Sequence, residues 1–405
     1  AARVVKACFL VASHPPEPAG GTEMVVVALA RELRQRGVEV VIVSGTEAPL
    51  ASAEVLTGVH DGVTVHRLPK RPEEQDRAGF VRPRLVARVR ELLARERPDV
   101  LHAHSLAALG VGFAAVAAEL GIPLVMTFHD LWVTCARFFR VPVQGVTCPS
   151  GADRGPCAAC VAAELRTDPG WVGAAIAERD RLVRAEVAAA RRWLAPSARA
   201  AAMVREWLPF AGPIDVVPHG LLRPVAAAER ALPPQPGERL RVGTFGGLVA
   251  EKGVGELLDA VAGLPVELHL SGRIYHEAIA ARIASARRAG VDVRVRGPYT
   301  PAEPHPARDL HLAVFPSKCQ ETYGLVVDEA LAHGVPVVCS DAGALAERRG
   351  AGGVEVVPLA ALSAALRELV GSPARLAALR AAIPARLPTI AAAAERHLAI
   401  YRSLS

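Results

Sequence analysis

Short apolar runs alternate with amphipathic stretches along most of the chain. In its first half, segments of helical spacing at 22–36, near 83–97 and near 106–120 separate the apolar runs VVKACFLVA, VEVVIVS, DVLHAHS and IPLVMTFHD. Fully apolar strands joined by helices are typical of a parallel sheet that is covered on both faces. The pattern therefore predicts a doubly wound α/β domain.

The same alternation resumes in the second half with the runs LRVGTFG, VELHLSG, VDVRVRG, HLAVFPS and VPVVCS. We interpret the proline- and alanine-rich segment PVAAAERALPPQPGER before them as an exposed linker. A chain of 405 residues is too long for one ordinary core, so two domains are expected. We place the first at 1–217, joined by a C-terminal helix at about 387–405, and the second at 218–386.

Composition and charge narrow the classes of partner. Hydrophobic residues make up 51% and charged residues 22%, which is typical of a globular protein. No apolar run reaches the roughly 18 residues of a membrane span, and the N-terminus lacks the layout of a signal peptide. We therefore expect a cytoplasmic protein.

The net charge of +6 comes from scattered basic residues, and aromatic residues are only 4% of the chain. Platforms for stacking nucleic-acid bases are therefore not expected, whereas an anionic small ligand or a membrane surface fits this charge. The segment ERDRLVRAEVAAARRWL carries five arginines, at 179, 181, 184, 191 and 192. A solvated helix face explains them most simply, and peripheral contact with the inner face of a membrane is the alternative.

Polar residues and glycines follow one expected strand after another in both halves. In open parallel sheets, ligands bind beyond the carboxyl ends of the strands, so these are the positions to examine. They are Gly20–Gly21, His104–Ser105, His129–Asp130, His219–Gly220, Gly246–Lys252, Gly272–Arg273, Gly297 and Ser317–Leu325. Taken singly, each could be a helix cap or a turn. Together they predict a ligand site in a cleft between the two domains.

The stretch HPPEPAGGTEMVV places Gly20 and Gly21 between the first strand and the first helix. Glycines there let backbone amides come close to a ligand, and the positive end of a helix dipole favours an anion such as phosphate. The GxGxxG fingerprint of dinucleotide sites is absent. A plain strand-to-helix turn is the alternative interpretation.

The most informative stretch is PSKCQETYGLVVDEALAHGVPVVCSDAG, in which Glu321 and Glu329 are eight positions apart. A pair of glutamates at helical spacing is usually a solvated face. In this frame, however, the stretch resembles the E-x7-E signature of retaining GT-B glycosyltransferases of family 4, followed by that family's GVPVV strand. The resemblance extends over most of the chain and implies the GT-B fold, with two Rossmann-like domains facing a central cleft.

The resemblance also implies how the second domain holds a nucleotide-diphosphate sugar, with UDP or GDP as the nucleotide. Glu321 would bind hydroxyls of the donor sugar, and Glu329 would bind the ribose. The donor phosphates would lie at the helix N-terminus formed by the turn Thr322, Tyr323, Gly324 and Leu325. Lys252, in GGLVAEKG, matches the family lysine that neutralises the diphosphate.

In the first domain, His129 matches the family histidine near the reacting carbon of the sugar, and the amides of Gly20 and Gly21 would approach the departing phosphate or the acceptor. The implied reaction is transfer to an acceptor hydroxyl with retained configuration, in which the leaving phosphate takes the proton of the acceptor. His129, Lys252 and Glu321 form the expected catalytic set. No cofactor or catalytic metal is expected, because Lys252 and the helix dipole replace a divalent cation.

The chain departs from the family at one position. Most members have an arginine in G-R-L-x-x-x-K-G, where this sequence reads Gly246-Gly247-Leu248. Losing a bidentate guanidinium should cost roughly 1.5–3 kcal/mol unless another group replaces it. Arg273, after a neighbouring strand, is our candidate, and an ordinary exposed arginine is the alternative. The departure keeps open a catalytically silent sugar-nucleotide-binding homologue. A sugar-nucleotide epimerase is the other alternative, because it shares the two domains and the way of holding the nucleotide, although the E-x7-E frame argues against it.

Four of the seven cysteines, Cys135, Cys148, Cys157 and Cys160, cluster in an insertion at about 131–170, with the spacing C-x12-C-x8-C-x2-C. The last pair has the spacing of a metal knuckle, so we expect a structural zinc site. Two disulfides, an iron–sulfur cluster and four free thiols are the alternatives. The other three cysteines lie in strand-like runs and are expected to be buried.

Overall fold

The computed structural model describes residues 4–17, 20–48, 55–70, 80–143, 148–149, 153–208 and 212–404. The chain divides into unit 1, residues 1–222 and 389–405, and unit 2, residues 223–388. The boundary expected after residue 217 comes too early, because Leu221 forms a β-bridge with Thr389 and accepts a hydrogen bond from the Ile390 amide, 3.0 Å long. This pairing keeps residues up to Leu222 in unit 1.

Unit 1 is built on a sheet of eight strands in the order β3-β4-β2-β1-β5-β6-β7-β8 within the described residues. The strands are β1 (Lys6–Val11), β2 (Glu39–Thr46), β3 (Leu56–His60), β4 (Val63–Pro69), β5 (Val100–Ala103), β6 (Leu124–Thr127), β7 (Arg192–Ala195) and β8 (Ile214–Val216). All neighbouring pairs are parallel except β3 and β4, which run antiparallel at the edge. The parallel sheet expected from the sequence is therefore confirmed, and the structure adds one antiparallel pair at its edge.

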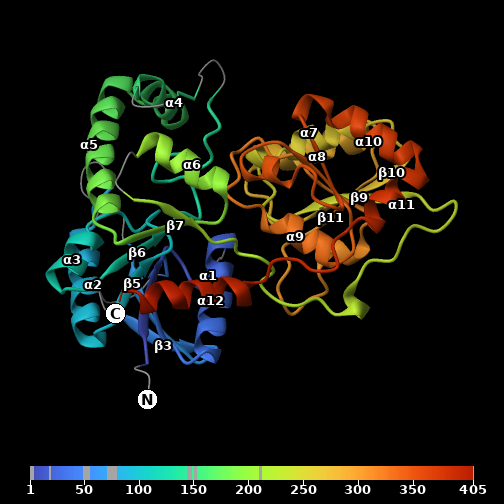
Figure 1. Cartoon of the computed structure of the whole chain (residues 1–405). Helices are drawn as coiled ribbons and strands as arrows, with labels where there is room; N and C mark the ends of the chain where they lie inside the picture. The colour runs from blue at the N-terminus through green and yellow to red at the C-terminus, as the bar shows by residue number, and fades with distance from the viewer. Residues whose placement is uncertain are drawn as a thin grey trace. The chain divides into compact units, whose positions relative to one another are not determined.

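The helices of unit 1 come from both ends of the chain. They are α1 (Gly21–Gln35), α2 (Pro83–Glu96), α3 (Phe113–Glu119), α4 (Gly155–Leu165), α5 (Pro169–Ala188), α6 (Ala198–Trp207) and α12 (Ile390–Arg402). Helix α12, red in Figure 1, returns the chain to unit 1 and packs against α1.

The helix expected over 106–120 begins later than the apolar pattern indicates. Gly110 has a φ of +87°, and a Cβ atom on it would lie 2.4 Å from the carbonyl oxygen of Phe80. A bridge between Val81 and Val111 fixes the same close approach of the two segments. The backbone at 106–112 therefore packs as a turn, and α3 starts at Phe113.

Unit 2 is built on a six-stranded sheet with the order β11-β10-β9-β12-β13-β14, and all its pairs are parallel. The strands are β9 (Leu240–Phe245), β10 (Val266–Ser271), β11 (Val293–Arg296), β12 (Leu312–Phe315), β13 (Val337–Ser340) and β14 (Val354–Val357). The helices are α7 (Val254–Ala260), α8 (Glu277–Arg288), α9 (Leu325–Ala332), α10 (Leu362–Gly371) and α11 (Pro373–Ala381).

Each unit buries its central strands completely. In unit 1, Cys8 of β1 is paired with Val41 of β2 and with Leu101 of β5, and all three side chains are buried. In unit 2, β12 and β13 are buried along their whole length. This burial explains the continuous apolar runs in the sequence, since both faces of each sheet are covered.

The segment expected as an exposed linker is partly packed on unit 2. Ala231 is buried, and its amide donates to the carbonyl of His333, 2.8 Å away. Arg380 of α11 donates to the Ala231 carbonyl. Residues on either side of Ala231 are mostly exposed, but Arg308 donates to the Ala228 carbonyl at 3.4 Å and Arg239 donates to the Val266 carbonyl at 2.7 Å. The segment therefore lies on the surface and is held at several points. In the described part of the chain, no helix has the length and apolar character that crossing a membrane requires.

Candidate active site

In unit 2, Lys252 and Glu321 meet beyond the carboxyl ends of β9 and β12. The lysine Nζ lies 2.5 Å from Oε1 of Glu321. Lys252 ends a single 3₁₀ turn, and Gly253 follows with a φ of +76°. A Cβ on Gly253 would lie 1.9 Å from the carbonyl oxygen of Pro316, so only glycine lets the lysine loop approach the end of β12 this closely.

Two further donors converge on the same carboxylate oxygen. Ser317 Oγ donates to Glu321 Oε1 at 2.8 Å, and Cys319 Sγ donates to it at 3.5 Å. Burial by itself would raise the pKa of Glu321, but Lys252 and these two hydrogen bonds outweigh it and lower the pKa. Burial would lower the pKa of Lys252, yet Glu321 and Cys319 raise it overall. Both groups are therefore charged at neutral pH.

The turn that follows Glu321 is held in place by the buried carboxylate of Asp328. Tyr323 donates through its hydroxyl to Asp328 Oδ2 at 2.6 Å, and Arg348 donates to Asp328 Oδ1 at 2.7 Å. The Arg348 guanidinium also lies over the Tyr323 ring, 5.0 Å from its centre. Thr322 and Gly324 complete this turn, and α9 begins at Leu325 with Gly324 as its N-cap residue. These contacts thus fix the orientation of the first backbone amides of α9.

Glu329 lies further along the chain, within α9, and is surrounded by a different set of side chains. Its Oε2 is 3.8 Å from Nε2 of His305, and its carbonyl accepts a 2.7 Å hydrogen bond from Nδ1 of His333. The two histidine rings stack with their centres 4.5 Å apart. Burial, followed by the charge of Glu329, raises the pKa of Tyr299. The carboxylate therefore lies in a partly aromatic environment.

The loops after β9 and β10 touch each other. The Gly246 amide donates to the carbonyl of Ser271 at 3.0 Å, and the Leu248 amide donates to the carbonyl of Arg273 at 2.9 Å. Gly247 is open, since a Cβ there would meet only the Tyr275 ring at 3.7 Å. The exposed Arg273 side chain has its guanidinium 5.9 Å from the centre of that ring. Arg273 thus lies in the loop paired with the Gly247 loop.

In unit 1, His129 belongs to a chain of buried imidazoles. His129 Nε2 lies 2.9 Å from Nδ1 of His104, and His129 Nδ1 lies 3.2 Å from Nε2 of His219. Burial lowers the pKa of all three rings, that of His219 to about 3. The rings are therefore neutral, and His129, in the middle of the chain, can donate one of its two hydrogen bonds and accept the other.

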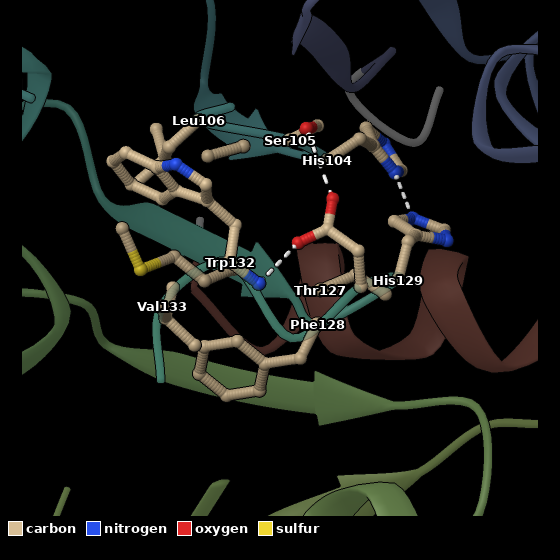
Figure 2. A pocket seen from close by; sticks show the side chains of 11 residues that line it. His104, Ser105, Leu106, Thr127, Phe128, His129, Trp132 and Val133 are labelled. Carbon is tan, nitrogen blue, oxygen red and sulfur yellow. Dashed lines mark hydrogen bonds between the residues drawn. The ribbon is translucent and has the colours of Figure 1, made fainter. Parts of the chain in front are cut away.

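The histidine chain borders a pocket of about 310 Å³ at the carboxyl ends of β5 and β6 (Figure 2). Asp130 lies in the wall of this pocket, where its carboxylate accepts hydrogen bonds from the Trp132 amide at 2.8 Å and from Ser105 Oγ at 3.3 Å. Burial raises the pKa of Asp130, and the charge of Glu23 adds to this. His104 Nε2 is buried without a hydrogen-bond partner among the described residues.

A second layer of buried polar groups supports this wall. His102 Nδ1 lies 2.6 Å from the Tyr401 hydroxyl of α12, and His102 Nε2 lies 2.8 Å from Thr127 Oγ1. The rings of His102 and His104 are 3.9 Å apart at their centres. The C-terminal helix therefore fixes the histidine wall, although it comes from the far end of the chain.

The contacts of Gly20 and Gly21, at the start of α1, differ from those expected from the sequence. The Gly20 amide already donates to a carboxylate, Oε2 of Glu23, at 2.8 Å. Gly21 is the first residue of α1, and neither glycine has a positive φ. An acidic side chain therefore occupies the position that the sequence assigned to a phosphate oxygen.

The four cysteines of the insertion line one pocket of about 400 Å³. Cys135, Cys148, Cys157 and Cys160 are all free thiols. Within the described residues, no three His, Cys, Asp or Glu side chains are grouped closely enough to hold a metal ion as they stand. The structure thus brings the four positions together around a cavity, and the zinc site stays a prediction. The remaining cysteines, Cys8, Cys319 and Cys339, are buried as expected.

Sequence comparisons identify the family. The model of Glycosyltransferase Family 4 matches residues 19–221, and that of Glycosyl transferases group 1 matches residues 239–372. The chain belongs to glycosyltransferase family 4. It is an enzyme of the hexosyltransferase type. A D-inositol 3-phosphate glycosyltransferase from Catenulispora acidiphila is 31% identical to this glycosyltransferase over 95% of the chain and 91% of the relative.

Other relatives and solved structures agree with this assignment. A GDP-mannose-dependent alpha-mannosyltransferase from Mycobacterium tuberculosis is 27% identical over 84% of the chain and 80% of the relative. Sucrose-phosphate synthase from Thermosynechococcus elongatus matches with a TM-score of 0.69, at 18% identity over 98% and 99% of the two chains. HepE from Anabaena, solved with UDP, matches with a TM-score of 0.66, at 17% identity over 98% and 100%. The two structures confirm the GT-B fold of this glycosyltransferase.

Several site residues were not assigned a role from the sequence. Ser317, Asp328 and Arg348 hold the Glu321 turn in unit 2, and His104 and His219 extend the His129 chain in unit 1. His104, His219 and Ser317 stand directly after strands, which is a signal that the sequence does carry. Asp328 and Arg348 gave no signal, because only folding brings their side chains together.

Proposed function

We propose that this glycosyltransferase moves a hexose from a UDP- or GDP-sugar to an acceptor hydroxyl and retains the anomeric configuration. The contact between Lys252 and Glu321 carries the proposal. It places one fixed positive charge and one carboxylate beside the N-terminus of α9, where a diphosphate and a sugar ring would meet. The names of the relatives support a nucleotide-sugar donor, since one is dependent on GDP-mannose.

The proposed donor geometry follows from how Glu321 is bonded. Oε1 accepts from Lys252, Ser317 and Cys319, and these three bonds leave Oε2 for a sugar hydroxyl. When a donor binds, Lys252 shares its charge between Oε1 and the diphosphate. The first amides of α9 add the positive end of a helix dipole to the same phosphates.

The proposed reaction depends mainly on stabilising the negative charge of the leaving diphosphate. It does not require a nucleophile from the protein. Breaking the bond between the anomeric carbon and the phosphate oxygen places negative charge on the leaving diphosphate, which Lys252 is positioned to neutralise. In front-face attack, the departing phosphate takes the proton of the acceptor hydroxyl, so configuration is retained without an enzyme-bound sugar. The described residues offer no support for an epimerase.

The neutral histidine wall of unit 1 suits hydroxyl groups. His129 adds no charge to this wall, because burial holds its pKa far below the usual range, and its two ring nitrogens already contact His104 and His219. A charged imidazolium would oppose the positive charge that develops on the sugar in the transition state. We therefore propose that His129 keeps the wall beside the reacting sugar uncharged, and we assign the pocket beside Asp130 to the acceptor side.

The test is incubation of the full chain with UDP- and GDP-sugars, each without an added acceptor, so that water serves as a slow acceptor. Proton NMR follows the nucleotide and the first-formed anomer of the released sugar before it mutarotates. Release of nucleoside diphosphate with the anomer of the donor supports the proposal. The inverted anomer overturns retention, an altered sugar on intact nucleotide indicates the epimerase, and binding without turnover indicates the silent homologue.

A further inference from the structure

None of the residues that line the cysteine pocket is used in the proposed function. The pocket is walled by the loop after β6 and by α4, and α4 packs against α5 (Figure 1). Cys135 lines the pocket from this loop and Cys148 lines it from the described residues 148–149. Cys157 and Cys160 line it from the first turns of α4. Four thiols on three segments thus share one cavity.

Two arginines already donate to the sulfur atoms. Arg137 Nη1 lies 3.4 Å from Cys160 Sγ, and Arg154 Nη1 lies 3.5 Å from Cys157 Sγ. Both guanidinium groups are held by other partners as well. Arg137 pairs with Glu164 at 3.0 Å, and Arg154 pairs with Asp180 at 2.7 Å. The sulfur atoms of Cys157 and Cys160 therefore each have a guanidinium group within hydrogen-bond distance.

The part of unit 1 that holds the four cysteines buries few apolar side chains, so a cross-link would stabilise it. The hairpin of α4 and α5 has a small core of its own, formed by Ala162, Val172 and Ile176. Cys157 is the only cysteine of the four that packs against this cluster among the described residues. So few apolar side chains contribute little burial energy, and small elements of this kind are commonly stabilised by a metal or by disulfides.

We propose that Cys135, Cys148, Cys157 and Cys160 bind one zinc ion and that Arg137 and Arg154 donate hydrogen bonds to its sulfur ligands. Four thiols lose four protons as four Zn–S bonds form, so a dication and four thiolates give a net charge of −2. The two guanidinium groups, each also paired with a carboxylate, donate N–H···S hydrogen bonds to this centre. Because the thiols are not yet grouped around one point, zinc binding draws their side chains inward into the cavity.

The test measures metal in the full chain, purified under reducing conditions without chelators. Elemental analysis should find one zinc per chain, and replacement of zinc by Co²⁺ should give the near-ultraviolet charge-transfer band of cobalt–thiolate bonds. Cys157→Ala should lose the zinc, whereas Cys8→Ala, which removes a buried thiol elsewhere in unit 1, should retain it. Arg137→Gln should keep the site but bind zinc roughly 10- to 100-fold more weakly.

Three results would overturn the proposal. A non-reduced mass lower by two or four hydrogens indicates disulfides, iron with acid-labile sulfide indicates a cluster, and metal-free protein that gives no cobalt–thiolate band indicates free thiols. Circular dichroism of each variant shows whether it folds. Nucleoside diphosphate binding should be the same before and after zinc removal, since Lys252 and Glu321 lie in unit 2. Failure of the zinc proposal is therefore distinguishable from failure of the proposed function.

Discussion

The two units of this glycosyltransferase use the same sheet edge for different chemistry. Unit 1 places neutral, fully buried imidazoles beyond its strands, whereas unit 2 places an ion pair between Lys252 and Glu321 there. Burial without a charged partner keeps the histidines uncharged, and the close partner keeps both groups of the pair charged. The comparison shows that the same edge of a parallel sheet can carry neutral side chains, which suit hydroxyl groups, or charged side chains, which suit phosphates.

The largest expected difference between the units is their response to acid. Among the described residues, unit 1 contains seven buried histidines whose pKa burial lowers: His14, His66, His102, His104, His129, His219 and His397. Unit 2 contains two, His311 and His333. Below pH 6.5 the unfolded chain protonates these rings while the folded unit does not, so stability falls as pH falls. Each ring should cost about 1 kcal/mol between pH 6.5 and 5.5.

Hydrogen exchange with mass spectrometry at pH 7 and pH 5.5 checks this prediction unit by unit. Peptides of the unit 1 strands should lose protection first, and His397→Gln should reduce the loss. Earlier loss of protection in unit 2 would show that the charged wall, and not the neutral one, limits acid stability.

The second prediction removes the charge from unit 2. Lys252→Ala should lower turnover by about 10²- to 10³-fold, because the leaving diphosphate loses a preorganised positive group. The matched control is Lys318→Ala, since Lys318 lies in the neighbouring loop and pairs with Glu256 at 2.9 Å. Release of nucleoside diphosphate measures both variants. Equal activity of the two variants would contradict the role given to Lys252.

The third prediction adds a positive charge to the same charged site of unit 2. Gly247→Arg restores the guanidinium that most family members have, and the open backbone at Gly247 accepts a side chain. Nucleoside diphosphate should bind roughly 10- to 100-fold more tightly, which corresponds to a charge-assisted hydrogen bond of about 1.5–3 kcal/mol.

Titration calorimetry measures this gain and also shows whether Arg273 already fills the role. If it does, Arg273→Ala weakens binding in the unaltered chain, while Arg294→Ala on β11 does not. No gain from Gly247→Arg combined with no loss from Arg273→Ala would place the diphosphate elsewhere.

The smallest expected effect concerns the start of α1 in unit 1. Glu23→Gln removes the carboxylate that holds the Gly20 amide, so inorganic phosphate should bind there more tightly by about 0.5–1.5 kcal/mol, the value of one hydrogen bond. Glu32→Gln is the control on the same helix, because Glu32 pairs with Arg36 at 2.8 Å. Thermal unfolding at increasing phosphate concentration measures the difference. A phosphate response that is identical in the two variants contradicts an anion site at Gly20.

The sequence predicted most of the sheet of unit 2 and the central strands of unit 1, because strands buried on both faces are continuously apolar. It did not predict β3 and β4, whose edge position leaves β3 partly exposed and without a long apolar run. It also misplaced the start of α3, because the apolar residues at 106–111 read as helical although close backbone packing at Gly110 prevents a helix.

What the sequence by itself determined is the chemistry available at each strand end, including Lys252, Glu321, His129 and the two glycines. Those residue types follow strands, and a parallel sheet brings all its carboxyl ends to one edge. Only the tertiary structure decided the partners, since the ion pair of Lys252 with Glu321 and the contact of His102 with Tyr401 join residues 69 and 299 positions apart. Burial then set the charge of each group, and burial is a property of the packed chain that no local pattern specifies.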